Sequence, residues 1–116
     1  MTIGYHDRNS PSGLTLMIID ARERGVEIEE YDTLPTTADT PLPHIVIVNP
    51  PAPIKKDEYW ENMAACISSH PTTRFLIFTP FQATCDGTRE FLGQPENIFY
   101  LTLKERAMKR LQALLE

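Results

Sequence analysis

Apolar residues fall into short runs along the chain, and polar or helix-like segments separate them. The middle run, Ile45 to Val48, is continuous and β-branched and lies between prolines. Such a run is typical of a strand buried on both faces, in a parallel sheet that helices cover. Because proline cannot donate to a strand ladder, Pro43 and Pro50 mark the limits of this strand. The strand therefore carries Asn49 to its carboxyl end.

Other runs predict further strands on both sides of the middle one. We expect them at residues 2–6, 26–33, 74–79 and 97–102. The strand at 26–33 alternates apolar and acidic residues, which is typical of a strand near a sheet edge. The acidic residues of this segment protect such an edge from pairing; they are Glu27, Glu29, Glu30 and Asp32.

Helices are predicted where apolar residues return at intervals of three and four positions. In residues 13–24 this stripe consists of Leu14, Met17, Ile18 and Ala21, and Gly25 ends the helix. In residues 57–69 it consists of Trp60, Met63, Ala64 and Ile67. Two more helices are expected at 85–92 and 104–115.

The alternation of strands and helices predicts an α/β fold with a parallel sheet and right-handed crossovers. We expect the flavodoxin-like or CheY-like three-layer arrangement with strand order 2-1-3-4-5, in which Asp7 and Asn49 flank one crevice. The second crossover, residues 34–43, contains three prolines and is expected to be a loop instead of a helix. Ten extended residues reach about 33–36 Å, which is enough to return along a strand of roughly 17–20 Å.

Composition and net charge argue against some classes of binding partner. The 116 residues suffice for one domain, and the net charge of −5 without a basic cluster argues against a nucleic acid or an anionic membrane as partner. No apolar run approaches the roughly 18 residues of a membrane span, and no signal peptide is visible, so we expect a cytoplasmic domain. Cys66 and Cys85 lie far apart, fit no metal spacing and are expected to be reduced.

The segment PHIVIVN, the helix after it and HPTTRFLIFTPF together resemble the centre of a two-component response-regulator receiver domain. In that family the third strand ends in the phospho-accepting aspartate, the fourth in a threonine or serine, and the fifth in a lysine before a proline. The resemblance covers nearly the whole chain and rests on register and element order.

Carried over by position, the acceptor aspartate falls on Asn49 and the acidic pair of the first strand falls on His6 and Asp7. The hydroxyl position falls on Thr79. The lysine position falls on Leu103, and Lys104 stands one residue later. Only Asp7 and Thr79 keep the residue type of the family.

This departure changes the chemistry that the resemblance implies. The amide of Asn49 is not the carboxylate nucleophile that accepts a phosphoryl group. One aspartate with a neighbouring histidine is also a poor site for Mg²⁺, which usually takes one or two carboxylates and the phosphate. The chain is thus similar to the pseudo-receiver between the kinase core and the true receiver in hybrid sensor kinases of the BarA/GacS type, and we expect no metal and no cofactor.

The resemblance implies a non-phosphorylatable module of a phosphorelay, spanning residues 1–116 and belonging to a longer protein. The module itself would not be an enzyme, although the parent would be a histidine kinase tethered to the inner membrane. Its partners would be the kinase core, the true receiver or a second copy. We expect the docking surface where the helix is missing, at Leu34 and Leu42 with Leu16 and Ile19 of the first helix. The alternative is that the prolines pin the loop over the core.

Other classes of function remain open at this stage. One alternative is a small α/β enzyme or phosphocarrier, similar to a phosphotransferase IIB domain or a TIR domain. A IIB domain would place a phospho-accepting Cys or His after the first strand. His6 is near that place, but no glycine-rich phosphate loop follows it. A nucleotide-binding module would need G-x-G-x-x-G or a P-loop, and neither is present. A structural role for His6, and a loop or capping role for Asp7, are the simpler interpretations.

Overall fold

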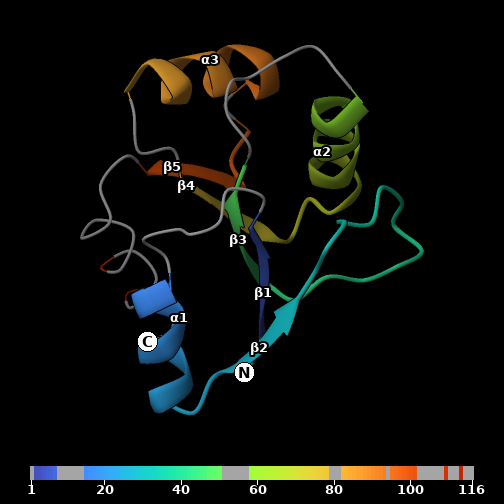
Figure 1. Cartoon of the computed structure of the whole chain (residues 1–116). Coiled ribbons are helices and arrows are strands. Elements are labelled where there is room, and N and C mark those ends of the chain that lie inside the picture. Colours follow the sequence, from blue (N-terminus) through green and yellow to red (C-terminus); the bar gives the residue numbers. More distant parts are fainter. Residues whose placement is uncertain are drawn as a thin grey trace.

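Five parallel strands form one sheet in the order β2-β1-β3-β4-β5. The computed structural model describes residues 2–7, 15–50, 58–78, 82–93 and 95–101, together with Lys109 and Ala113. In chain order the elements are β1 (Thr2–Asp7), α1 (Thr15–Glu23), β2 (Glu27–Glu30), β3 (Ile45–Asn49), α2 (Glu58–Ser69), β4 (Arg74–Phe78), α3 (Gln82–Leu92) and β5 (Ile98–Leu101). The structure confirms the predicted order of the five strands (Figure 1).

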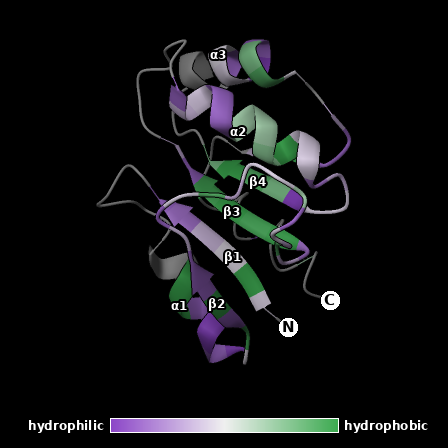
Figure 2. Ribbon diagram, turned by 90° about the vertical axis from the view of Figure 1, so that its right-hand side faces the viewer, coloured by the Kyte–Doolittle hydropathy of each residue, from purple (hydrophilic) through white to green (hydrophobic). Residues whose placement is uncertain are grey.

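β3 is the centre of this sheet, as the β-branched run predicted. All five of its residues, Ile45 to Asn49, are buried, and the strand pairs with β1 on one side and with β4 on the other. β3 and β4 are hydrophobic over nearly their whole length, whereas the edge strand β2 is hydrophilic (Figure 2). The acidic residues of β2 are exposed at this edge, as expected.

Helices cover both faces of the sheet. α1 packs on one face through Ile18 and Ala21, which contact Ile3 of β1 and Ile47 of β3 in one core cluster. α2 lies on the opposite face with α3 (Figure 1). The second cluster on that face consists of Val46, Val48, Trp60, Met63, Cys66, Ile67, Phe75, Ile77 and Ile98.

The helix limits follow local chemistry. α1 ends before Gly25, whose φ of 85° is readily adopted only by glycine, and Gly93 closes α3 in the same way with φ of 76°. α2 buries the predicted Trp60, Met63 and Ile67. α3 begins at Gln82, earlier than predicted, because its first turn carries no apolar stripe by which the sequence could reveal it.

The connection between β2 and β3, residues 31–44, contains no helix, which confirms the predicted loop crossover. Leu34 and Leu42 of this loop are half-buried and pack against the cluster on the α2 face. α1 packs on the other face, so the loop and α1 lie on opposite sides of the sheet. The loop covers part of the core, and docking through Leu34, Leu42, Leu16 and Ile19 stays a prediction.

Lys109 and Ala113 are helical; the rest of the helix predicted at 104–115 lies outside the described residues. Within the described part of the chain, every helix is too short or too polar to cross a membrane.

Candidate functional site

Asp7 and Asn49 are paired across the last rung of β1 and β3, at the carboxyl edge of the sheet, as the predicted strand order required. Asn49 is 2% exposed, and its Oδ1 has no hydrogen-bond partner among the residues that the structure describes. Leaving a buried acceptor unpaired costs about 1–3 kcal/mol. The position that the sequence resemblance matches to the acceptor carboxylate of receiver domains thus holds a buried, neutral amide.

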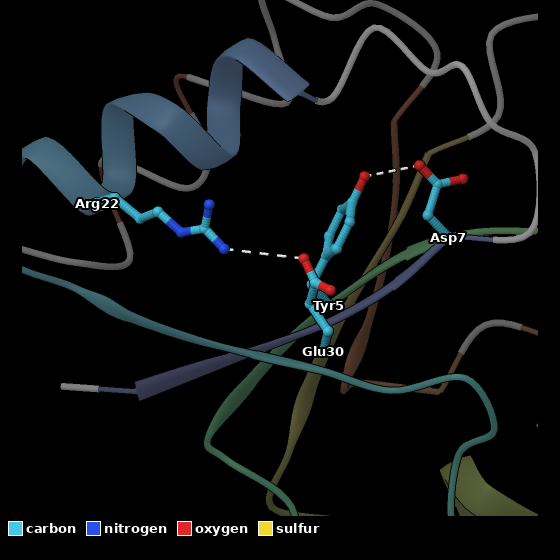
Figure 3. A network of polar contacts seen from close by, with 4 residues as sticks. All are labelled: Tyr5, Asp7, Arg22 and Glu30. Carbon is cyan, nitrogen blue, oxygen red and sulfur yellow. Dashed lines mark hydrogen bonds and ion pairs between the residues drawn. The ribbon is translucent and has the colours of Figure 1, made fainter.

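The carboxylate of Asp7 is engaged within its own strand. Tyr5 precedes it by two residues, so both side chains lie on the same face of β1. The Tyr5 hydroxyl donates to Asp7 Oδ2 at 2.6 Å (Figure 3).

Figure 3 also shows the ion pair between Arg22 and Glu30 at 3.8 Å, which links α1 to β2 at an exposed position. Such an exposed pair contributes little to stability.

His6 faces the opposite side of the sheet from Asp7, because successive strand residues alternate between faces. The ring is 2% exposed, with Nδ1 2.9 Å from the Tyr31 carbonyl oxygen and Nε2 3.0 Å from the Tyr59 hydroxyl. A carbonyl oxygen only accepts, so Nδ1–H donates to it, while Nε2 pairs with the Tyr59 hydroxyl, which can donate or accept. The ring also stacks on Tyr59, with the centroids 5.8 Å apart. His6 thereby joins the end of β2 to α2.

The remaining positions of the predicted pocket cannot be placed together with these three. Thr79, Leu103 and Lys104 lie outside the described residues, as does the side chain of Leu16. Among the residues described, no group of three or more His, Cys, Asp or Glu side chains could hold a metal ion. The described part of the site thus offers Asp7 as its carboxylate, beside the Asn49 amide.

A second polar cluster, which the sequence reasoning missed, holds the loop in place. Ser69 Oγ donates to the Thr36 carbonyl at 3.0 Å, and Thr73 Oγ1 donates to the Pro43 carbonyl at 3.1 Å. Between them, His70 Nε2 lies 2.8 Å from the Thr40 carbonyl oxygen. We name Ser69, His70 and Thr73 the carbonyl clasp. These donors lie in the polar run Ser-Ser-His-Pro-Thr-Thr, which the sequence analysis did not assign to contacts with the loop.

A pocket of about 120 Å³ lies where the loop meets α2. Its lining combines loop residues, helix residues and the His6 ring: His6, Asp32, Thr33, Leu34, Tyr59, Asn62 and Met63. A second, more open pocket of about 580 Å³ includes Glu29 and Tyr31. Burial, and next to it the hydrogen bond and charge of Glu29, raise the pKa of Tyr31 to about 12. The Tyr31 hydroxyl is therefore neutral at physiological pH.

No protein-family model matches the chain, and no curated protein matches it either. Among solved structures, the chain is similar to the BeF3-activated receiver domain of DrrB, with a TM-score of 0.59 and 13% sequence identity. The likeness covers 98% of this chain and 96% of that domain. The chain therefore has the receiver fold, as the sequence resemblance predicted, and at this identity the likeness extends to the fold alone.

Proposed function

We propose that the chain is a receiver-like signalling module of a two-component system that does not take up a phosphoryl group. The observation that carries this proposal is the buried amide of Asn49 at the acceptor position. An amide nitrogen is not a nucleophile toward phosphate, whereas the acyl phosphate of a receiver forms on a carboxylate. The chain thus has the fold of domains that are switched by phosphorylation, but the amide of Asn49 stands in place of the reacting carboxylate.

The neighbours of Asn49 support the same conclusion. Asp7 directs Oδ2 at the Tyr5 hydroxyl, and His6 uses both ring nitrogens for contacts on the opposite face. A phosphorylation site needs Mg²⁺ and positive groups aimed at the charge that develops on the phosphoryl oxygens. In the described part of the chain, Asp7 and His6 instead form hydrogen bonds within the domain.

The role we propose is that of an interaction or spacer module in a cytoplasmic part of a hybrid sensor histidine kinase, similar to the BarA/GacS type. Its partners would be the kinase core and the true receiver of the same protein, or a second copy. Ile19 on α1 is a large exposed hydrophobic residue, 44% exposed, and with Leu16 is our candidate contact. The module would set the distance and orientation of the modules on either side.

Titration with Mg²⁺ and beryllofluoride, a phosphoryl mimic, tests the proposal that the site at Asp7 and Asn49 takes up no phosphoryl group. We expect the backbone amide resonances of Asp7 and Asn49 to stay at their starting positions in a two-dimensional NMR spectrum. An intact receiver domain titrated in parallel is the positive control. Saturable shifts centred on Asp7 and Asn49 would show that the pocket still binds the mimic and would contradict the proposal.

The spacer role needs a separate test in the parent protein. Replacing the module by a flexible linker of similar span should change phosphotransfer between the flanking modules, because their geometry is no longer fixed. Asn49→Leu in the same protein is the matched control and should leave phosphotransfer unchanged. An unchanged rate of phosphotransfer after the replacement would exclude the spacer role, even if the site at Asn49 takes up no phosphoryl group.

A further inference from the structure

The pocket between the loop and α2 lies on the opposite side of the sheet from the Asp7 side chain. His6 precedes Asp7 on β1 and faces α2, where it lines the pocket together with Tyr59 and Met63. Parallel α/β sheets bind ligands in the crevice outside the carboxyl ends of their strands, where the strand order reverses. In this sheet the reversal falls between β1 and β3. The pocket is therefore a second crevice at this edge, separate from the side chains of Asp7 and Asn49.

Contacts within the domain hold the walls of this pocket in place. The His6 ring is 2% exposed and connects the end of β2 to α2 through both of its nitrogens. On the loop side, Ser69 of the carbonyl clasp donates to the Thr36 carbonyl at 3.0 Å, two residues after the lining residue Leu34. A ligand that enters a pocket formed in advance has to order fewer groups when it binds.

The lining is polar toward solvent and apolar toward the core. Asp32, Thr33 and Asn62 are exposed lining residues. Met63, in contrast, is 3% exposed and belongs to the core cluster on the α2 face, against which Leu34 packs. The volume of about 120 Å³ corresponds to about four molecules of liquid water. A ligand that fits is therefore small, with a polar head toward solvent and a short apolar chain toward the core.

The charge around the pocket favours a cation. Asp32 supplies a carboxylate, and the lining residues that the structure describes include neither lysine nor arginine. Glu58 and Glu61 in the first turn of α2 add negative charge on the helix side. An anion would meet these carboxylates without a positive partner. An ammonium group has three N–H donors, and the side-chain oxygens of Asp32, Thr33 and Asn62 can each accept a hydrogen bond.

We propose that this pocket binds a small alkylammonium cation. The ammonium group lies at the exposed oxygens of Asp32, Thr33 and Asn62. The carbon chain enters between Leu34 and Met63, toward the core. Asp32, Thr33 and Leu34 all come from the loop that takes the place of a helix in the second crossover. Binding at this pocket does not depend on whether the other side of the sheet edge takes up a phosphoryl group.

Three ligands of equal chain length and different charge test the proposal: n-butylammonium chloride, 1-butanol and sodium butyrate. Each is titrated to millimolar concentration into the whole chain at constant ionic strength and followed by two-dimensional NMR. With butylammonium we expect saturable shifts of the backbone amides of residues 32–34 and 59–63, and an affinity at least about fivefold higher than that of the other two ligands. Equal affinity for 1-butanol or butyrate, or no saturable shift with butylammonium, would overturn the proposal.

Two variants locate the cation. Asp32→Asn keeps the size of the side chain and removes its charge, so it should weaken butylammonium binding by at least about fivefold. Asp39→Asn is the matched control, because Asp39 is an exposed acidic residue of the same loop outside the pocket lining, and it should leave the affinity unchanged. Unchanged affinity in Asp32→Asn, or an equal loss in both variants, would overturn the pocket. If Asp32→Asn does not fold, the ligand series on the unmodified chain decides.

Discussion

Asn49 lies directly beside Asp7 on the last paired rung of β1 and β3, and its Oδ1 is buried without a hydrogen-bond partner in the described part of the chain. The backbone thus brings two side chains to the place where parallel sheets carry their sites. One side chain is neutral, and the other is engaged by Tyr5. The chain thus has the receiver fold, and its described residues place one carboxylate and one amide at this edge of the sheet.

Restoring the acceptor carboxylate alone should not restore the site. Asn49→Asp supplies a nucleophile, but His6 remains turned to the other face and Asp7 remains bonded to Tyr5. We expect no saturable Mg²⁺ binding at millimolar concentration. The NMR shifts of the backbone amides of Asp7 and residue 49 measure this binding. Binding localised to the two carboxylates would show that the pocket needs only its acceptor.

The carbonyl clasp should stabilise the fold. Thr73 is 3% exposed, so Thr73→Val keeps the shape of the side chain and removes the donor to the Pro43 carbonyl. We expect the free energy of unfolding to fall by about 1 kcal/mol, the usual net value of one hydrogen bond. Urea denaturation measures this change.

The chain offers a matched control for the clasp. Thr72 is the exposed neighbour of Thr73, and Thr72→Val should change the free energy of unfolding by less than about 0.5 kcal/mol. Ser69→Ala against Ser68→Ala repeats the comparison at the end of α2, with the gain in helix propensity cancelled. Equal effects within each pair would mean that the clasp contributes nothing to stability.

Leu34 and Leu42 should behave as core residues and Ile19 as a surface residue. The two leucines are half-buried against the α2-face cluster, so Leu34→Ser and Leu42→Ser should each lower the free energy of unfolding by about 1–3 kcal/mol. Ile19→Ser should leave stability nearly unchanged and weaken association with the flanking modules, measured by sedimentation. Stable leucine variants that lose association would instead assign docking to the loop.

The Cys66 thiol should stay protonated in the folded chain. Burial raises its pKa from 9.0 to about 12, so above pH 9.0 the folded state holds a proton that the unfolded chain releases. Stability must therefore fall as the pH rises from 9.0 to about 12. In a Cys85→Ala background, a thiol reagent at pH 9.0 should modify Cys66 only after denaturant is added. Modification of the native chain at the denatured rate would contradict this burial.

Much of the fold could be predicted because the sequence carries its signals locally. The run from Ile45 to Val48 marked the central strand, the spacing of Trp60, Met63 and Ile67 marked α2, and three prolines excluded a helix in the second crossover. The start of α3 was missed, since a first turn without an apolar stripe has no periodic signal.

The site was less accessible to sequence reasoning. Strand order placed Asp7 beside Asn49 correctly. The contacts of His6 with Tyr31 and Tyr59 depend on residues far apart in the chain, and no local pattern encodes them. The same holds for the carbonyl clasp, whose acceptors are backbone oxygens and therefore leave no trace in residue type.

Intact-mass spectrometry after incubation with acetyl phosphate and Mg²⁺ tests the central claim most directly. An intact receiver domain in the same reaction shows that the donor is active. Because Asn49 provides no carboxylate at the acceptor position, we predict that the mass of this chain does not change. A stoichiometric gain of one phosphoryl group, removed by hydroxylamine as an acyl phosphate is, would contradict it.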